Sequence, residues 1–481
     1  MQFLQTMLWI LVPLVVGIVA GPWVAQRMKR NKRAGLQRIA DLIQRHFDPL
    51  DIESLTIAER TFPFRVRADL QQAVDRIFGD GVDIVRFCGV KKEYWMGGLD
   101  FSGLLTDEQQ PALAAPPQYE QIDIGETQPI DCLKNGLWLL AQGDQRYAVL
   151  VSAQERPGEE PGLRFHVATA NTAAGTRFAQ GFYRHLEDSV LKAQSYRGKI
   201  LSLETKRSYF GEASGITVHR LRTVEREQVI LPQKTLELLE RNVIQFVQRR
   251  DRLRQLGQST KKGLLFYGPP GTGKTHTIHY LARALKGHTT LLISSEQVGL
   301  LTEYMALARL LQPSVVVIED ADLIAREREA MGSPCEEVLL NRLLNEMDGL
   351  KEDADILFVL TTNRPETLER ALASRPGRID QAIEFPVPDE VGREKLVSLY
   401  SQGVSLGDEV ATDLVRRTEG VSAAFIKELM RRSVQFHLER ADSGQIEQTD
   451  VDRALDELLF SGGSLNATLL AAGTNGAACR A

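Results

Sequence analysis

The sequence predicts an α/β fold: a parallel sheet covered by helices, followed by a helical lid and preceded by an α+β domain. Three observations carry this prediction. Short apolar runs alternate with helical segments from residue 233 onward, the pattern beyond residue 389 is helical, and residues 50–225 mix helical and strand-like stretches. Strict alternation of strands and helices is typical of a parallel sheet with both faces covered.

Length and composition indicate an ordinary globular chain of several domains. The chain has 481 residues, of which 43% are hydrophobic and 25% charged. At ~100–200 residues per domain, a chain of this length is expected to form about three domains. The four cysteines lie far apart without a CxxC pair, which argues against a zinc ribbon or a disulfide framework. The net charge of −5 gives no general reason to expect a nucleic-acid partner.

The N-terminal segment predicts a single transmembrane helix within residues 1–26. Residues 7–25 carry no charged side chain, and about 20 apolar residues span a bilayer core. Basic residues follow this run, whereas a cleaved signal peptide carries its charge before it; they are Arg27, Lys29, Arg30, Lys32 and Arg33. The positive-inside rule then places the N-terminus outside and the rest in the cytoplasm. The alternative is a buried or interfacial helix containing Pro13 and Pro22.

Patterning divides the rest of the chain into five segments. A basic juxtamembrane segment with a helix (27–50) precedes an α+β N-domain (51–230), a large α/β subdomain (231–388), a helical lid (389–460) and a disordered tail (461–481). In the N-domain we expect helices over 67–78 and 171–194, with Asn171 as N-cap, and a loop over 103–120. Its expected strands are 137–140, 147–151, 163–168, 199–203 and 216–221. The large subdomain has expected strands at 263–267, 291–293, 315–318 and 356–360.

A phosphate-binding loop follows the first of these four strands. The loop matches GxxxxGK[ST] between a strand and a helix, and its residues are Gly268, Pro269, Pro270, Gly271, Thr272, Gly273, Lys274 and Thr275. Glycines let backbone N–H groups approach phosphates closely, and the helix N-terminus adds partial positive charge. Lys274 is expected to reach the β- and γ-phosphates of ATP, and Thr275 to bind Mg²⁺. A chance glycine-rich turn is the alternative.

Two adjacent acids end the strand 315–318, where a phosphate-loop protein needs a carboxylate for Mg²⁺. With Glu319 and Asp320 in place, residues 313–325 resemble the Walker B segment of the AAA family of ATPases. Most members carry Asp and then Glu, whereas this chain carries Glu and then Asp. The resemblance implies that Glu319 takes the Mg²⁺ side and Asp320 polarises water, and the swap leaves open which acid does which.

The resemblance extends over residues 233–460. Residues 341–349 are similar to the helix before the sensor strand, and residues 361–365 resemble the sensor 1 turn, which implies that Asn363 orients the attacking water. Residues 371–380 match the arginine-finger segment, which implies that Arg375 and Arg378 enter a neighbouring subunit's nucleotide site. A homo-oligomeric ring, hexameric in the family, is therefore expected. The alternative for Arg378 is a structural salt bridge with Asp380.

Three departures from the family pattern refine the expectation. The span 294–313 is short, with Tyr304 as its only aromatic residue, and this resembles the mitochondrial inner-membrane AAA translocase that exports a folded iron–sulfur protein. The lid segment 418–425 has no arginine at the sensor 2 place. The sequence contains no HExxH motif, which argues against a fused metalloprotease activity.

The expected function is a membrane-anchored, Mg²⁺-dependent ATPase whose ring remodels, unfolds or translocates a protein client that the sequence does not name. One alternative is a nucleotide-binding scaffold with little turnover. A nucleic-acid-directed ATPase is less favoured: apart from the five basic residues at 27–33, 53 of the 58 Lys and Arg remain against 63 Asp and Glu. The role of the N-domain stays open.

Overall fold

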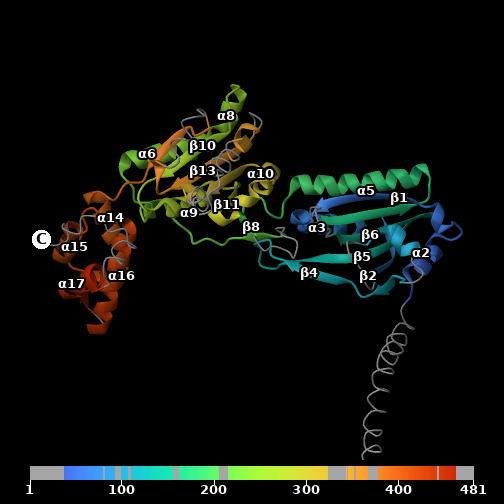
Figure 1. Cartoon of the computed structure of the whole chain (residues 1–481), viewed down its shortest axis with the longest axis horizontal. Coiled ribbons are helices and arrows are strands. Elements are labelled where there is room, and N and C mark those ends of the chain that lie inside the picture. The colour runs from blue at the N-terminus through green and yellow to red at the C-terminus, as the bar shows by residue number, and fades with distance from the viewer. Residues whose placement is uncertain are drawn as a thin grey trace, which may run out of the picture. The chain divides into compact units, whose positions relative to one another are not determined.

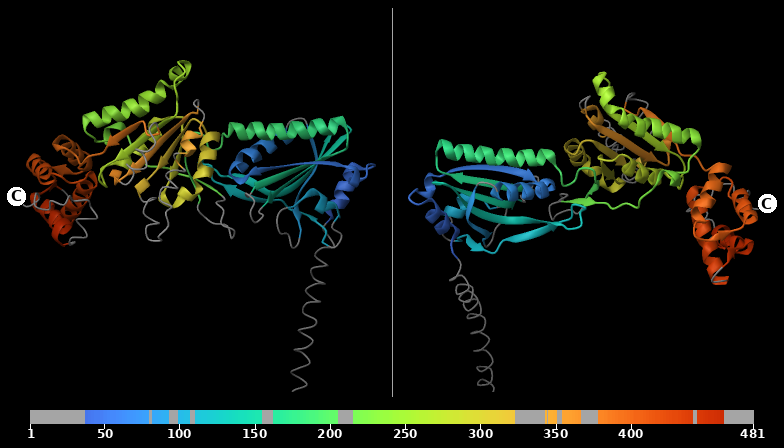
Figure 2. Two further views of the ribbon diagram at one scale, coloured as in Figure 1. Left: turned by 45° about the horizontal axis from the view of Figure 1, so that its top comes forward. Right: turned by 180° about the vertical axis from the view of Figure 1, so that it is seen from behind.

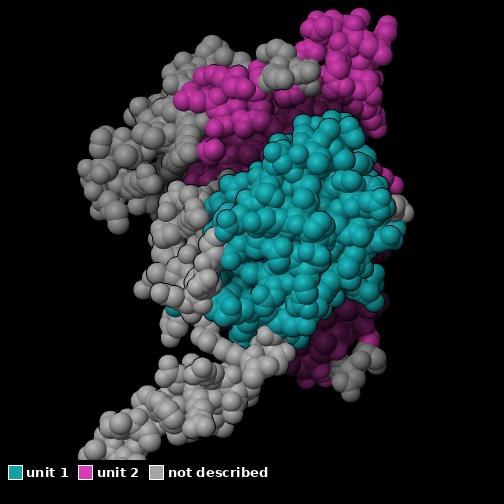
Figure 3. All heavy atoms as spheres, turned by 90° about the vertical axis from the view of Figure 1, so that its right-hand side faces the viewer, with its two compact units in different colours: residues 1–195 teal, residues 196–481 magenta. Residues whose placement is uncertain are grey.

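The computed structural model describes residues 37–79, 82–92, 99–106, 110–154, 162–204, 215–322, 343, 345–350, 354–366, 378–440 and 444–461 (Figure 1). The chain divides into two compact units, Met1–Ser195 and Tyr196–Ala481 (Figure 3). The expected anchor over residues 1–26 and residues 462–481 of the expected tail lie outside the described residues. Among the helices within the described ranges, none is both long and apolar enough to cross a membrane.

The first unit is built on an antiparallel sheet of seven strands. Their order is β1 (Thr56–Pro63), β7 (Gly162–Thr169), β6 (Gln145–Gln154), β5 (Ile130–Gln142), β2 (Asp83–Lys91) and β3 (Leu113–Ala115), with β4 (Gln118–Ile122) also paired to β5. Alternate residues of β5 serve opposite faces: Leu137 and Leu139 join the core beneath α2 (Ile39–Phe47), whereas Trp138 packs on Phe78 of α3 (Arg67–Gly79).

Two local expectations for this unit were wrong. The segment 103–120 was expected to be a loop, but it holds the end of α4 (Phe101–Thr106), then β3, and the start of β4. Ala112 and Ala114 are buried there, in the core cluster that also contains residues of α2. The long helix is α5 (Ala173–Lys192), and its N-cap is Thr172 rather than Asn171, since Thr172 Oγ1 accepts a hydrogen bond from Gly175 N at 3.1 Å.

The second unit contains the predicted sheet, with three further strands. The order is β14 (Gln381–Glu384), β10 (Lys262–Tyr267), β13 (Ile356–Thr362), β12 (Ser314–Ile318), β11 (Thr289–Ile293), β8 (Ile200–Leu203) and β9 (Ile216–Val218). All neighbours are parallel except β8 and β9. Every residue of β12 and β13 is buried, as strands covered on both faces require. The phosphate-binding loop connects β10 to α9 (Lys274–Ala284), both of which are labelled in Figure 1.

Strands β8 and β9 extend this second sheet, although the sequence placed them in the N-domain. Tyr304 of α10 (Leu301–Leu310) explains the attachment: its hydroxyl accepts from Leu203 N at 2.7 Å and donates to Leu292 O at 3.0 Å. Tyr304 is fully buried. The only aromatic side chain of the span 294–313 therefore links β8 to β11 by hydrogen bonds.

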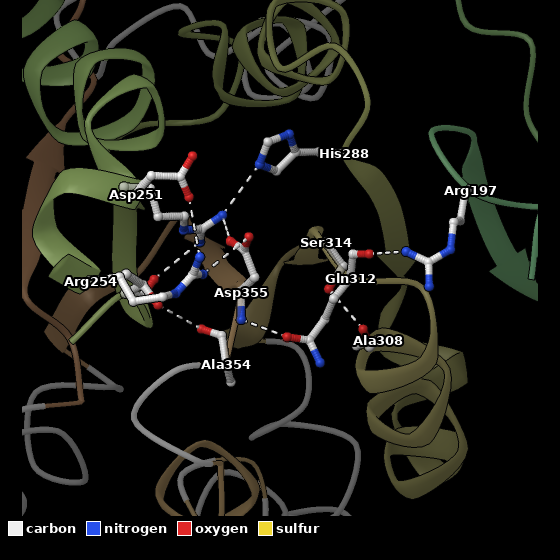
Figure 4. A network of polar contacts seen from close by, with 11 residues as sticks. Arg197, Asp251, Arg254, His288, Ala308, Gln312, Ser314, Ala354 and Asp355 are labelled. Carbon is white, nitrogen blue, oxygen red and sulfur yellow. Dashed lines mark hydrogen bonds and ion pairs between the residues drawn. The ribbon is translucent and has the colours of Figure 1, made fainter. Parts of the chain in front are cut away.

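The connection between the two units is anchored on both sides of Tyr196. Ser195 N donates to Asp69 Oδ1 at 3.0 Å within the first unit. Arg197 donates to Leu310 O at 3.0 Å and also contacts Gln312 O, at the C-terminal end of α10, where helix carbonyls carry partial negative charge (Figure 4). This contact lies where β12 begins, at the end of the sheet opposite the phosphate loop.

The helices of the lid pack around one apolar core; Figure 2 shows these helices in orange and red. They are α14 (Glu390–Tyr400), α15 (Asp408–Arg417), α16 (Ala423–Arg440) and α17 (Gln448–Asp456), with β15 (Ser405–Leu406) and β16 (Gln445–Ile446) as a short pair. The sheet is flanked by α6 (Gln233–Glu240), α7 (Phe246–Gln248), α8 (Arg250–Gln255) and α9 (Lys274–Ala284), together with the short turns η3 (Arg226–Gln228) and η5 (Ser295–Leu300).

Candidate active site

Positive φ angles in the loop between β10 and α9 are carried by glycines, and two of these glycines also lie against neighbouring atoms. Gly268 has φ +145°, and a Cβ there would lie 2.2 Å from Phe385 O. Gly271 has φ +75°, and a Cβ there would lie 2.9 Å from Ala424 Cβ of the lid. Ala424 N donates to Gly271 O at 3.0 Å, so the lid closes directly onto the loop.

Lys274 begins α9 with its side chain buried inside this loop. Its Nζ donates to Gly268 O at 2.8 Å and to Pro269 O at 2.9 Å. Burial lowers the pKa of Lys274 from 10.5 to about 8, while the charges of Asp320 and Asp322 act in the opposite direction. The ammonium thus stays mainly protonated at neutral pH and presents a positive charge to the loop.

Thr275 and Glu319 bring two hard oxygen atoms together. Thr275 Oγ1 donates to Glu319 Oε1 at 2.9 Å, joining the start of α9 to the end of β12. Hydroxyl and carboxylate oxygens are ligands that Mg²⁺ accepts in phosphate sites, usually with waters and substrate phosphates completing the shell. The pair therefore fits Mg²⁺. Among the described residues no group of three or more His, Cys, Asp or Glu side chains is arranged to hold a metal ion.

Asp320 has an unusual backbone, with φ +48°. Its N donates to Thr361 Oγ1 at 2.9 Å, and its Oδ1 accepts from Asn363 Nδ2 at 3.1 Å. Among non-glycine residues, Asp and Asn enter the left-handed region most readily because their short side chains can bond locally. This gives a physical reason for Asp rather than Glu at the second position of the acid pair.

Lys274, Thr275, Asp320 and Asn363 line one cavity of about 410 Å³ between the sheet and the lid, whereas Glu319 is not among its lining residues. It is lined by Gln228, Val229, Ile230, Leu231, residues 270–277, Asp320, Thr361, Asn363, Leu396, Tyr400, Ala423, Ala424 and Lys427. The sequence analysis did not single out Lys427. A usable signal was its position one turn into α16, the helix whose Ala424 contacts Gly271. Lys427 is exposed and contributes positive charge near His276.

Of the two residues expected as arginine fingers, the structure describes Arg378, and it does not line this cavity. Arg378 pairs with Asp348, and its side chain is 12% exposed. The expected alternative partner was wrong: Asp380 Oδ2 instead accepts from Gly263 N at 2.7 Å, which fixes the start of β10. Arg375 lies outside the described residues, as do residues 341, 342 and 344 of the helix expected before the sensor strand.

Comparison with known proteins covers the same part of the chain. Residues 264–387 match the family described as "ATPase family associated with various cellular activities (AAA)". An "ATP-dependent zinc metalloprotease FtsH 3" of Synechocystis is 33% identical over 245 residues, which is 48% of this chain and 38% of that protein. "Proteasome-activating nucleotidase" of Methanoculleus marisnigri is 33% identical over 245 residues, covering 48% and 56%.

The same nucleotidase of Methanothermobacter thermautotrophicus is 31% identical over 271 residues, covering 54% of this chain and 62% of that protein. The chain thus spans between 38% and 62% of the length of these three relatives. The similarity confirms the resemblance to the AAA family of ATPases for this part of the chain.

Proposed function

We propose that the whole protein is a membrane-anchored motor. The proposal starts from the ATPase domain of the AAA family that the chain contains, a family that uses ATP with Mg²⁺. The motor hydrolyses ATP to ADP and phosphate and uses the energy to remodel, unfold or translocate a protein. It acts as a homo-oligomeric ring, hexameric in arrangement, with its N-terminus outside and its ATPase domain in the cytoplasm.

One observation carries the hydrolytic part of the proposal: the Asp320–Asn363 contact lies in the same cavity as the phosphate loop. Lys274 offers charge to the β- and γ-phosphates, and Asp320 accepts a proton from water while Asn363 orients it. Thr275 and Glu319 would hold Mg²⁺, which would supply positive charge against the negative charge that develops on the phosphate. Residues 268–275 supply backbone N–H groups to the phosphates.

A nucleotide-binding scaffold with little turnover is the second candidate. It needs only the loop and Lys274, and it gives no reason for the left-handed backbone of Asp320 or for its bond to Asn363. Strained backbone that persists at one residue is common where chemistry takes place. The geometry around Asp320 therefore favours turnover.

A protein client is the favoured substrate class. The relatives' names couple nucleotide use to a metalloprotease and to proteasome activation, whereas this sequence has no HExxH motif. Since Tyr304 is buried in the fold, the span 294–313 presents no exposed aromatic side chain to a client. Client contact is accordingly assigned to other surfaces of the ring.

The test uses the full chain purified from membranes. We expect Mg²⁺-dependent phosphate release that Lys274→Ala abolishes, ring particles in ATPγS, and solubility in alkaline carbonate only after deletion of residues 1–26. Asp320→Asn should retain ATP and trap the client for identification. ATP binding without phosphate release in the assembled wild-type protein would favour the scaffold instead.

A further inference from the structure

Asp322 is a buried acid that the reaction scheme above does not use. It lies two residues after Asp320, and its side chain is 3% exposed. A buried carboxylate needs hydrogen bonds to offset the loss of water. Asp322 Oδ1 accepts two, from Thr362 Oγ1 at 2.8 Å and from Asn363 N at 3.1 Å.

These two bonds fix the turn after β13 against the turn after β12. Thr362 is the last residue of β13, and its hydroxyl oxygen also accepts from Arg364 N at 2.9 Å, so the turn is held on both sides of Asn363. The Asn363 side chain then reaches Asp320 Oδ1. Asp322 thus holds the backbone of the residue whose amide contacts Asp320.

Asp322 acts from behind the cavity. Among the described residues, Asp320 and Asn363 line the cavity and Asp322 does not. We propose that Asp322 is a positioning residue for hydrolysis, which keeps the Asn363 amide in register with Asp320. The proposal rests on the proposed function, because it assigns Asp322 to the same reaction.

A double-mutant cycle tests this role in the full-length, membrane-extracted protein. Asp322→Ala should lower kcat by ~10- to 100-fold, because a small misplacement of a catalytic group can cost that much. The Kd for ATPγS should change by less than about threefold, since Asp322 accepts its hydrogen bonds from Thr362 and Asn363 and not from the phosphate loop. In an Asn363→Ala background the further loss should be under about twofold, because the two residues act as one unit. Asp322→Asn, which keeps an acceptor oxygen, should recover part of kcat.

Asp69 offers a matched control in the first unit. It is also a buried carboxylate, and its Oδ1 accepts from Ser195 N and Ser195 Oγ, both at 3.0 Å. Asp69→Ala should lower the melting temperature and leave kcat unchanged. A full, additive loss from Asp322→Ala in the Asn363→Ala background would overturn the proposal, as would an equal kcat loss in Asp69→Ala.

Failure of the proposed function has a different signature. A wild-type protein that assembles and binds ATPγS without hydrolysing it contradicts the motor, and Asp322 is then judged by structure alone. The positioning role predicts that a structure of Asp322→Ala shows Asn363 Nδ2 withdrawn from Asp320. An unchanged Asn363–Asp320 contact in that structure would overturn it.

Discussion

Asn363 Nδ2 donates a hydrogen bond to Asp320 Oδ1 at 3.1 Å, joining the ends of β13 and β12 beside the phosphate loop. An amide fixed on a carboxylate leaves the second carboxylate oxygen for a water molecule. The swapped acids therefore have distinct neighbours: Glu319 meets Thr275, and Asp320 meets Asn363.

The first prediction separates the two acids. Asp320→Asn should lose at least ~100-fold in kcat while retaining ATP affinity, because the general base is removed. Glu319→Gln should chiefly raise the Mg²⁺ concentration needed for half-maximal rate. Nucleotide binding and phosphate release measured on both variants test this assignment. If Glu319→Gln lost turnover and Asp320→Asn changed the Mg²⁺ dependence, the two roles would follow residue type and not position. Asp320→Glu should be less active than the wild-type protein, because the left-handed backbone disfavours the longer side chain.

The second prediction concerns the lid lysine. Lys427 lines the cavity from α16 and is exposed, so Lys427→Ala should weaken ATPγS binding by roughly fivefold, the equivalent of about 1 kcal/mol for one exposed charge contact. Raised salt should narrow the difference between variant and wild type. Titration calorimetry measures it. Lys395→Ala on α14 is the control, an exposed lid lysine outside the cavity lining, and equal effects from both would contradict a local role.

The third prediction tests catalysis shared between subunits. Arg378→Ala should bind ATP almost normally and hydrolyse it ~10³-fold more slowly, since an arginine supplied in trans can contribute that much. Mixing it with Lys274→Ala should restore activity, because each subunit supplies what the other lacks. Co-assembled mixtures no more active than the separate variants would contradict shared sites. A melting curve must accompany the kinetics, because Arg378 also pairs with Asp348.

The fourth prediction concerns Tyr304. Tyr304→Phe removes the acceptor for Leu203 N and the donor to Leu292 O. Leaving buried backbone groups unpaired should lower the free energy of unfolding by about 1–3 kcal/mol. Urea-induced unfolding of the second unit measures the change in this free energy. Tyr119→Phe, at an exposed site, is the control. Unchanged stability, or a client-processing defect without any loss of stability, would contradict the role of Tyr304 in linking β8 to β11.

The parts of the fold that repeat a strong pattern were predictable from sequence. Strands β10 to β13 and the loop after β10 follow from continuous apolar runs and a fixed motif. Strands β8 and β9 have four and three residues, too few to indicate which sheet they join. Their placement depends on Tyr304, a contact separated by about a hundred positions in the sequence.

The candidate site was predictable where the motif itself names the residue. Asp322 and Lys427 were missed because their roles depend on what faces them: Asp322 on the turn at Asn363, and Lys427 on how the lid closes over Gly271. The partner of Arg378 was also missed, since Asp380 is near in sequence while Asp348 is near in space. The membrane anchor stays a prediction.

The anchoring of Ser195 and Arg197 has a mechanical consequence. Only Tyr196 stands between the two fastenings, and two residues of extended chain span at most ~7 Å. A pull on the backbone at Tyr196 would load the contacts of Arg197 with Leu310 O and Gln312 O, at the end of α10 and just before β12. Because β8 runs parallel to β11, a pull along it loads their ladder in shear, the direction in which several hydrogen bonds share the force instead of opening one by one.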